Sequence, residues 1–289
     1  VSSEVKAVKY AETITGLEES LDEMFNRLSM PFEKQKELFE YANKRNIEIF
    51  STPFDFESVD FLESLNVKLY KIASMDLVNI PLIKYVANTQ KPMIISTGMS
   101  NLGQIEDAVE TVRKTGNKNL ILLHCNSSYP AAPEEMNLKA INNLQSAFDI
   151  PVGLSDHTFG LFVSQTAICL GADVIERHFT IDRTFEGPDH ILSSEPDEMS
   201  ELVSMSEKIP AILGNGVKRI QPNEYDTINT QRKSLYASCN IKKGNIIDEK
   251  MIAIKGPGGG LLPKYLDIII GRIAKEDINK DFPITWDLI

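Results

Sequence analysis

The sequence predicts an α/β fold, a (β/α)8 barrel represented by its last six βα units, followed by a small, mostly β module. Three observations predict it. Six short apolar runs alternate with segments of helical periodicity, at about 28 residues for each unit, which is the size of a βα repeat. Polar residues follow each apolar run. The end of the chain reads as short strands and turns rather than further βα units.

The elements are expected in the following order. Residues 1–25 are polar, without a strand-like run, and are expected to form a connecting segment; a helix is expected over residues 32–46. Strands are then expected over residues 47–50, 68–72, 93–95, 120–123, 152–154 and 174–175. The helices that follow them are expected over residues 57–65, 81–87, 102–114, 138–147, 161–170 and 196–213.

Polar residues after the strands decide between a barrel and an open sheet. They are Ser51, Thr52, Ser74, Ser96, Thr97, residues 124–128, residues 155–157 and His178. In a TIM-type barrel all strand ends border one mouth, so that these groups can converge, whereas an open sheet spreads them along an edge. No GxGxxG tract follows a strand, which excludes a dinucleotide-binding sheet. A barrel is therefore expected, with its missing first two strands and the helix between them preceding Val1.

Three regions follow from this organisation. Residues 1–213 are expected to form the partial barrel, residues 214–231 a polar linker with two glycines and no periodicity, and residues 232–289 the small module. The module contains a GPGGG tract, which needs backbone freedom.

Composition limits the partners of the chain. The net charge of −11 argues against nucleic acid and anionic membranes, because both favour a basic surface. No apolar run is long enough to span a bilayer. The three cysteines form no motif, so a reduced, cytoplasmic setting is expected.

Two histidines suggest a metal site. His157 and His178 each follow an apolar run, and the helical segment between the runs implies that the two strands are parallel. Both imidazoles are then expected at the carboxyl end of the sheet, where they suit a divalent metal with positions open for substrate. The alternative is that each is an ordinary polar residue after a strand.

Several tracts together resemble the sialic acid synthase family, which includes legionaminic and pseudaminic acid synthases. They are FSTPFD, YKIAS, ISTGMS, LLHCNSSYP, GLSDHT, IERHFT and GPDH, and the C-terminal IKKGNIIDEKMIAIKGPGGG resembles an antifreeze-like (SAF) domain. The resemblance covers the chain from about Met30 onward. It implies an enzyme that condenses phosphoenolpyruvate with an N-acylated mannosamine-type sugar, releasing phosphate and forming a nine-carbon 2-keto acid.

The resemblance also assigns site residues. Phosphoenolpyruvate is assigned to Thr52, Lys71, Ser74, Ser96, Ser127 and Ser155. Tyr129 and Asp189 are assigned to the sugar, and Asp76 stands where the family has a glutamate that binds sugar and moves protons. A metal (Mn, Mg or Co) on His157 and His178 is expected to polarise the sugar aldehyde. Lys71 also points to an anion on its own terms, because a lysine inside an apolar strand is costly to bury unpaired.

The chain departs from the family pattern in three respects. The units expected before Val1 carry a glutamate and a phosphate-binding lysine in the family, and Asp76 is one methylene shorter than the usual glutamate. The SAF tract reads Lys255-Gly256-Pro257 where relatives have an arginine after the lysine. The resemblance further implies a domain-swapped homodimer, with residues 214–231 spanning between the subunits.

Two other functions remain open from the sequence alone. One is a non-catalytic carbohydrate-binding or assembly protein that lacks the first two barrel units. The other is a different phosphoenolpyruvate-dependent aldol synthase, although a phosphosugar substrate asks for more arginine than follows these strands. The particular acyl-sugar and the preferred metal do not follow from the sequence.

Overall fold

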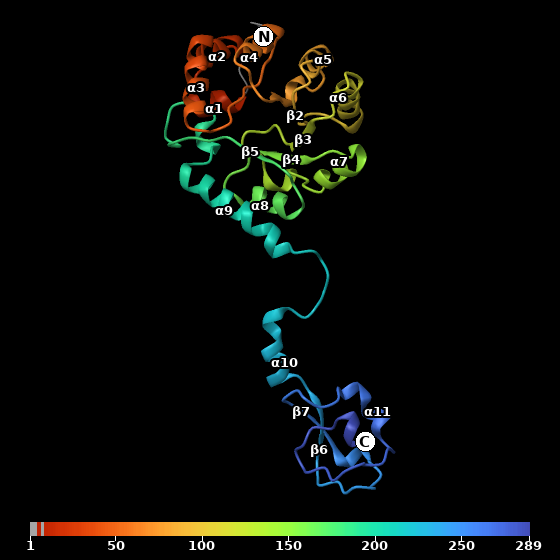
Figure 1. Cartoon of the computed structure of the whole chain (residues 1–289). Coiled ribbons are helices and arrows are strands. Elements are labelled where there is room, and N and C mark those ends of the chain that lie inside the picture. Colours follow the sequence, from red (N-terminus) through yellow and green to blue (C-terminus); the bar gives the residue numbers. More distant parts are fainter. Residues whose placement is uncertain (1–4, 7–8) are drawn as a thin grey trace. The chain divides into compact units, whose positions relative to one another are not determined.

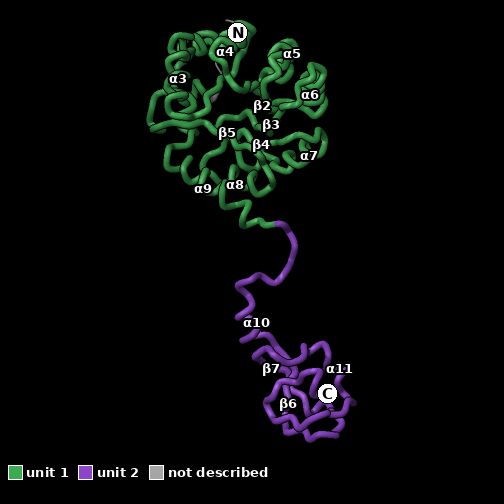
Figure 2. Tube along the Cα trace, in the orientation of Figure 1, with its two compact units in different colours: residues 1–214 green, residues 215–289 purple. Residues whose placement is uncertain are grey.

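The chain forms two compact units, residues 1–214 and residues 215–289 (Figure 2). The computed structural model describes residues 5–6 and 9–289.

The described part of unit 1 is built around a curled, five-stranded parallel sheet in the order β1-β2-β3-β4-β5 (Figure 1). The strands are β1 (Tyr70–Ile72), β2 (Met93–Ser96), β3 (Leu120–Cys125), β4 (Val152–Asp156) and β5 (Ile175–Arg177). Spatial order equals sequence order, as expected when each helix crosses over to the next parallel strand. The carboxyl ends of all five strands consequently lie along the same edge.

Helices connect the strands and precede the sheet. They are α1 (Lys9–Thr15), α2 (Leu21–Leu28), α3 (Phe32–Lys44), α4 (Phe56–Ser64), α5 (Ile80–Ala87), α6 (Leu102–Lys114), α7 (Ala140–Phe148), α8 (Phe162–Cys169) and α9 (Pro196–Leu213). The main core lies between this sheet and its helices.

Helix α6 illustrates how the sequence sets these elements. Asn101 caps its first turn by accepting from the backbone of Gln104, whose side chain in turn accepts from the backbone of Asn101. Ile105, Val109 and Val112 recur at helical spacing and are buried against the core. The cap fixes where the helix starts, and the apolar stripe fixes which side faces the sheet.

Gly153 allows β4 and β5 to approach closely. A Cβ at this position would lie 2.2 Å from the carbonyl oxygen of Val174 and 2.8 Å from Leu123 Cδ2. Because backbone cannot move aside cheaply, only glycine fits here. The close approach holds the ends of β4 and β5 next to each other, where the two histidines follow.

The expected first strand is the main difference from the sequence-based expectation. Residues 47–50 are described but form no strand, so the described sheet has five strands where six were expected. Ile47 is well exposed, and Glu48 forms an ion pair with Lys68 instead of a backbone ladder. A strand needs a neighbour for its backbone groups, and β1 pairs with β2 alone among the described strands.

Two segments expected to be irregular contain helices. Within the described part of residues 1–25 lie α1 and the start of α2; residues 1–4 and 7–8 of that prediction lie outside the described range. A capping box between Ser20 and Glu23 starts α2, and Met24 is buried. In the expected linker, residues 225–231 form α10 (Tyr225–Gln231). These three helices are only seven or eight residues long, which is shorter than the stretch over which helical periodicity is judged.

Unit 2 has a small antiparallel sheet with its own core. β6 (Ser234–Ala237) pairs with β7 (Ile252–Lys255), and α11 (Leu266–Ile269) packs beside them. Buried Leu235, Ile247 and Ile284 belong to this core. Its backbone agrees with the expected short strands and single short helix near residues 264–270. Across both units, no helix in the described ranges is long and apolar enough to cross a bilayer.

Candidate active site

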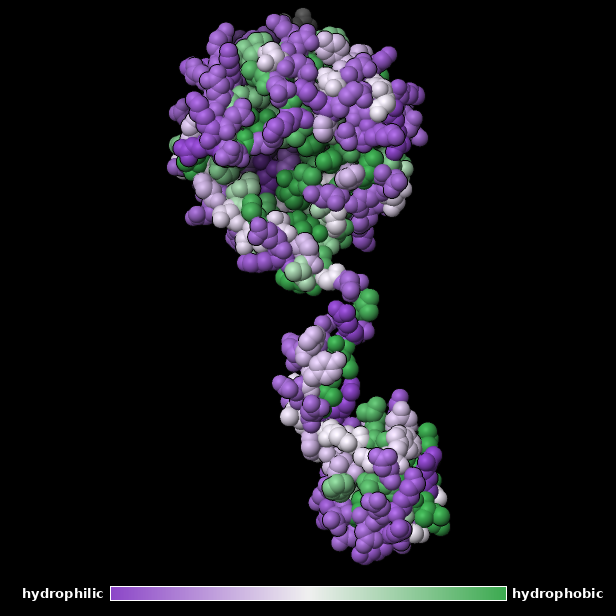
Figure 3. All heavy atoms as spheres, in the orientation of Figure 1, coloured by the Kyte–Doolittle hydropathy of each residue, from purple (hydrophilic) through white to green (hydrophobic). Residues whose placement is uncertain are grey.

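A cavity of about 1140 Å³ opens at the carboxyl ends of the strands in unit 1. Nine of the residues predicted from the sequence line it: Thr52, Lys71, Ser74, Ser96, Ser127, Tyr129, Ser155, His157 and His178. Its other walls include apolar side chains, among them Met24 and Phe25 of α2 and Phe54. Figure 3 shows unit 1 hollowed on one face, with hydrophilic residues inside the hollow and hydrophobic ones gathered along part of its border.

Lys71, Ser96 and Glu176 form one group of side chains in this cavity, the lysine end. The Lys71 side chain projects from β1 and is buried, with Nζ donating to Ser96 Oγ at 2.7 Å and to the carbonyl of Ile72 at 3.0 Å. Nζ also lies 3.5 Å from Glu176 Oε2. Burial lowers the pKa of Lys71, and the nearby Glu176 carboxylate opposes that change. The buried lysine was expected to pair with an anion, and the Glu176 carboxylate of the same chain provides one.

Glu176 is a functional candidate that the sequence analysis did not assign. Its Oε1 accepts from Ser155 Oγ at 2.7 Å, while its Oε2 faces Lys71. Cys125, Ser155 and Glu176 stand in register across β3, β4 and β5, and all three line the cavity. Glu176 could have been predicted from the sequence, because it stands two residues before His178 and residues two apart on a strand share a face.

The two predicted metal ligands and Tyr129 form a second group of side chains in the cavity, the imidazole end. The ring centroids of His157 and His178 lie 5.2 Å apart, and the ring planes are near perpendicular. Tyr129 lies against His157, with ring centroids 4.1 Å apart and ring planes tilted by 37°. The structure therefore brings together the two imidazoles that the βα repeat placed at one edge.

The tautomers of both rings follow from their partners. His157 Nδ1 lies 2.8 Å from the carbonyl of Asn126, which can only accept, so Nδ1 carries the proton. His178 Nδ1 lies 3.4 Å from Asp189 Oδ2, and a carboxylate at this place favours a proton on the same nitrogen. In each neutral ring Nε2 then keeps its lone pair. A carbonyl or carboxylate behind Nδ1 is the usual support of a metal-binding histidine.

Two imidazoles with this support fit a divalent cation whose remaining positions go to water and substrate. No group of three or more histidine, cysteine, aspartate or glutamate residues with metal-binding geometry occurs among the described residues. The donor set therefore suits an open, exchangeable site rather than a closed structural one.

The pKa values of His157 and of two groups near it, Cys125 and Tyr129, differ from their usual values. Burial lowers the pKa of His157, but the Cys125 sulfur and the Asn126 carbonyl outweigh it, so the net pKa is raised. Burial raises the pKa of Cys125, but hydrogen bonds with His157, Ser74 and Ser127 outweigh it, so the net pKa is lowered. Burial raises the pKa of Tyr129, which keeps its hydroxyl protonated and able to donate. Cys125 is, after Glu176, a second functional candidate that the sequence analysis did not assign.

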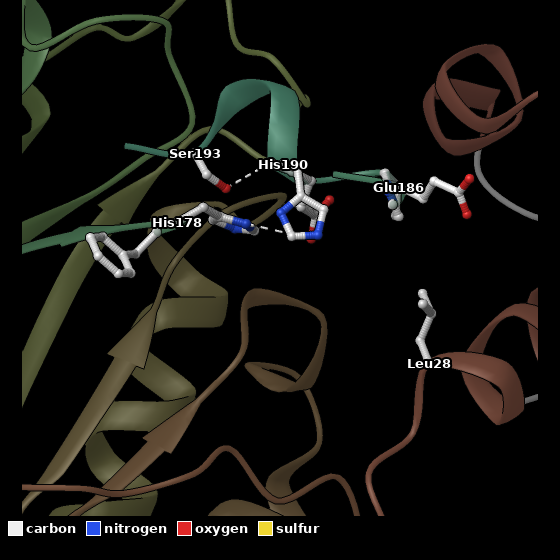
Figure 4. Close-up of a pocket in the computed structure, with 9 residues that line it drawn as sticks. Leu28, His178, Glu186, His190 and Ser193 are labelled. Carbon is white, nitrogen blue, oxygen red and sulfur yellow. Dashed lines mark hydrogen bonds and ion pairs between the residues drawn. The ribbon is translucent and has the colours of Figure 1, made fainter. Parts of the chain in front are cut away.

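Asp189 lies on the far side of His178, in a smaller pocket of about 310 Å³. Figure 4 shows His178, Glu186, His190 and Ser193 coming from one continuous segment, with Leu28 of α2 opposite. Asp189 contacts His178 from this side but is absent from the lining of the large cavity. Its predicted contact with a sugar stays a prediction.

Asp76 also lies outside the lining of the large cavity. It sits in a 3₁₀ turn, Ser74–Asp76, and its Oδ1 accepts from Asn79 Nδ2 at 2.9 Å. Asn79 in turn caps α5. The predicted role of Asp76 toward a sugar likewise stays a prediction.

Comparison with known proteins places the chain in a family. Residues 1–218 match the model of the NeuB family, and residues 232–289 match the SAF domain. The chain belongs to the NeuB family. The family resemblance expected from the sequence is therefore confirmed.

Two sequence relatives and one solved structure illustrate the similarity of this NeuB chain. It is 47% identical to an uncharacterised protein of Methanocaldococcus jannaschii, over 92% of this chain and 79% of the relative. It is 42% identical to the N,N'-diacetyllegionaminic acid synthase of Campylobacter jejuni, over 97% of this chain and 85% of the relative. The crystal structure of the N-acetylneuraminic acid synthetase of Leptospira borgpetersenii superposes with a TM-score of 0.67 at 37% identity, covering 71% of this chain and 72% of that one.

Proposed function

We propose that this NeuB chain is a nonulosonic acid synthase that condenses phosphoenolpyruvate with an N-acylated mannosamine-type sugar and releases phosphate. The cavity carries the proposal, because a buried lysine with hydroxyl groups lies at one end and two supported imidazoles at the other. Family membership supports the same activity, since relatives named for legionaminic, pseudaminic and sialic acid synthesis match most of the chain.

The lysine end suits phosphoenolpyruvate. Lys71 provides a positive charge in a buried setting, and Ser74, Ser96 and Ser127 provide hydroxyl donors around it. Hydrogen bonds between charged donors and phosphate or carboxylate oxygens are short and strong. These groups would hold phosphoenolpyruvate and exclude water from its enol carbon. When phosphoenolpyruvate is absent, Glu176 would keep Lys71 charged.

The imidazole end suits the sugar aldehyde. His157 and His178 would hold a divalent cation, which supplies a Lewis acid for the carbonyl oxygen when bound. The Tyr129 ring lies beside both imidazoles, and its protonated hydroxyl can donate to a sugar oxygen. Attack by the enol carbon, addition of water and loss of phosphate then complete a balanced condensation.

The test is phosphate release by the full chain. Phosphoenolpyruvate is combined with N-acetyl and di-N-acetyl hexoses, with Mn²⁺ present or removed by chelation. We expect phosphate release that needs sugar, phosphoenolpyruvate and metal together, and a 2-keto acid product detectable by mass spectrometry.

Two outcomes count against the proposal. Sugar binding without phosphate release would favour a non-catalytic carbohydrate-binding protein. Release only with a phosphorylated aldose would favour another phosphoenolpyruvate-dependent aldol synthase.

A domain-swapped homodimer belongs to the same proposal, with the SAF unit of one subunit serving the site of the other. Light scattering coupled to gel filtration measures the mass directly. A monomer at the concentration used for the activity assay contradicts the dimer without contradicting the chemistry.

A further inference from the structure

A buried ion pair joins β4 and β5 directly behind the two histidines. Arg177 Nη1 lies 2.5 Å from Asp156 Oδ2, and the two side chains are 1% and 0% exposed. The residues are register partners across the two strands. Asp156 immediately precedes His157 in the sequence, and Arg177 immediately precedes His178.

Strand alternation separates the ion pair from the cavity. Ser155 and Glu176 line the cavity, and so do His157 and His178, two residues further along each strand. Asp156 and Arg177 lie between them and face the other side of the sheet, where Ser164 of α8 contacts both. The pair therefore touches neither substrate nor cation in the proposed function.

The Asp156 carboxylate is fully bonded. Oδ1 accepts from the backbone nitrogen of Thr158 at 2.9 Å and from its hydroxyl at 2.7 Å. Oδ2 accepts from Ser164 Oγ and from Arg177 Nη1, both at 2.5 Å. Thr158 directly follows His157, so these bonds fix the backbone on both sides of that imidazole.

Arg177 extends the same restraint to His178. Its Nη2 donates to the carbonyl of Thr158 at 2.9 Å, and its Nε donates to Ser194 Oγ at 2.8 Å. The backbone nitrogen of Ser194 donates in turn to the carbonyl of His178 at 2.8 Å. One guanidinium thus connects the residue after His157 with the segment that pairs beside His178.

Stability alone does not explain such a pair. Removing two charges from water is costly, and a buried ion pair contributes little net stability compared with apolar residues of the same size. What this one does provide is a fixed distance between two strand ends, because the planar guanidinium bonds in several set directions. Two imidazoles can hold one cation only if both nitrogens reach it at coordination distance, so this distance decides whether the two rings share a metal.

We propose that Asp156 and Arg177 are positioning residues that fix the separation and orientation of His157 and His178. The inference rests on the proposed function, in which those imidazoles hold the divalent cation. It goes further by assigning metal affinity to a pair on the opposite side of the sheet.

The main test is Arg177→Lys in the full chain. Lysine keeps the positive charge beside Asp156 but cannot reach Ser194 and Thr158 together. We expect Mn²⁺ affinity, measured by electron paramagnetic resonance, to fall roughly 10- to 100-fold, as for other residues that support metal ligands. We also expect the metal-free protein to lose nuclear Overhauser contacts among the ring protons of His157, His178 and Tyr129.

Arg113→Lys is the matched control. Arg113 also connects two elements, by donating from α6 to the carbonyl of Phe148 at the end of α7, but it does not line the cavity. We expect it to leave Mn²⁺ affinity and the ring contacts unchanged. A second variant, Ser194→Ala, removes one bond to Arg177 without unpairing a buried charge, and we expect a smaller loss in the same direction.

The outcomes separate this inference from the proposed function. Unchanged Mn²⁺ affinity and unchanged ring contacts in folded Arg177→Lys, or in Ser194→Ala if the former does not fold, would overturn the positioning role. Absence of Mn²⁺ binding in the unaltered chain would count against the proposed function, and the metal-free ring contacts would still decide the positioning role.

Discussion

The two ends of the cavity differ in how their functional groups are held. Lys71 projects from within a strand, and its partners Ser96 and Glu176 come from two other strands of the same sheet. His157 and His178 come just after strands, and the groups behind them, Asn126 and Asp189, belong to connecting segments. The lysine end is therefore set by sheet register, whereas the imidazole end needs additional bonds to hold its shape.

This contrast predicts that the two ends can be damaged separately. Changes at the lysine end are expected to weaken anion binding and leave the cation in place. Changes at the imidazole end are expected to do the reverse.

Lys71→Met is expected to have the largest effect. It removes the buried positive charge from the anion site, so kcat/KM for phosphoenolpyruvate should fall by about 10³-fold, as when a main electrostatic donor is lost. Mn²⁺ affinity should stay unchanged. Steady-state kinetics and a metal titration measure both. Lys91→Met is the matched control, because Lys91 pairs with Glu63 away from the cavity; equal losses in the two variants would contradict the assignment.

Gly98→Ala is expected to come next. A Cβ there would lie 2.2 Å from Ser127 Oγ and 2.9 Å from Ser74 Oγ, so both hydroxyls would have to turn away. Misplacement on this scale is expected to reduce kcat/KM for phosphoenolpyruvate by about 10²-fold while the protein stays folded. Gly103→Ala is the control, since its nearest non-adjacent atom is 3.5 Å away. A normal KM in Gly98→Ala would show that these hydroxyls do not contact the anion.

Asp189→Asn tests the imidazole end. The carboxylate next to His178 Nδ1 becomes a neutral amide, which supports the ring less strongly as a ligand. Mn²⁺ affinity is expected to fall about tenfold, with the affinity for phosphoenolpyruvate preserved. Asp182→Asn in the same connecting segment serves as the control, because its carboxylate bonds only its neighbour Thr184 among the described residues. If Asp189→Asn weakened phosphoenolpyruvate binding instead of Mn²⁺ binding, the two ends would not be independent of each other.

Glu176→Gln is expected to have the smallest effect at neutral pH. Glu176 opposes the lowering of the Lys71 pKa by burial, so its neutralisation should lower that pKa further. Lysine binds an anion only when protonated, below its pKa. The alkaline limit of kcat/KM for phosphoenolpyruvate should therefore move to lower pH, and a pH profile measures this. A limit that stays in place would mean that Glu176 does not govern the charge of Lys71.

The sequence predicted the part of this site that depends on strands. Strand ends marked by Ser96, Ser155 and His178 were expected to meet at one edge, and a parallel sheet in sequential order brings them there. The sequence could not indicate that residues 47–50 form no strand, because an apolar run does not show which other strand its backbone will pair with.

The groups behind the site were harder to predict for a different reason. Glu176 and Cys125 reach the cavity through cross-strand register, which a single strand pattern does not give. The contacts of Arg177 with Thr158 and Ser194 join positions 19 and 17 residues apart through side-chain geometry alone. Such bonds depend on rotamers that become defined only when the surrounding segments have packed.

The alternation along β5 has a consequence for how this chain tolerates change. Glu176 faces the cavity and Arg177 faces α8, so deleting one residue earlier in the strand would move Arg177 to the position of Glu176 and Glu176 to the position of Ile175, opposite Leu154. A guanidinium would then enter the substrate space, and Asp156 would lose its arginine partner. Length variation in this strand is therefore far more damaging than substitution, and any insertions among relatives are expected in the connecting segments instead.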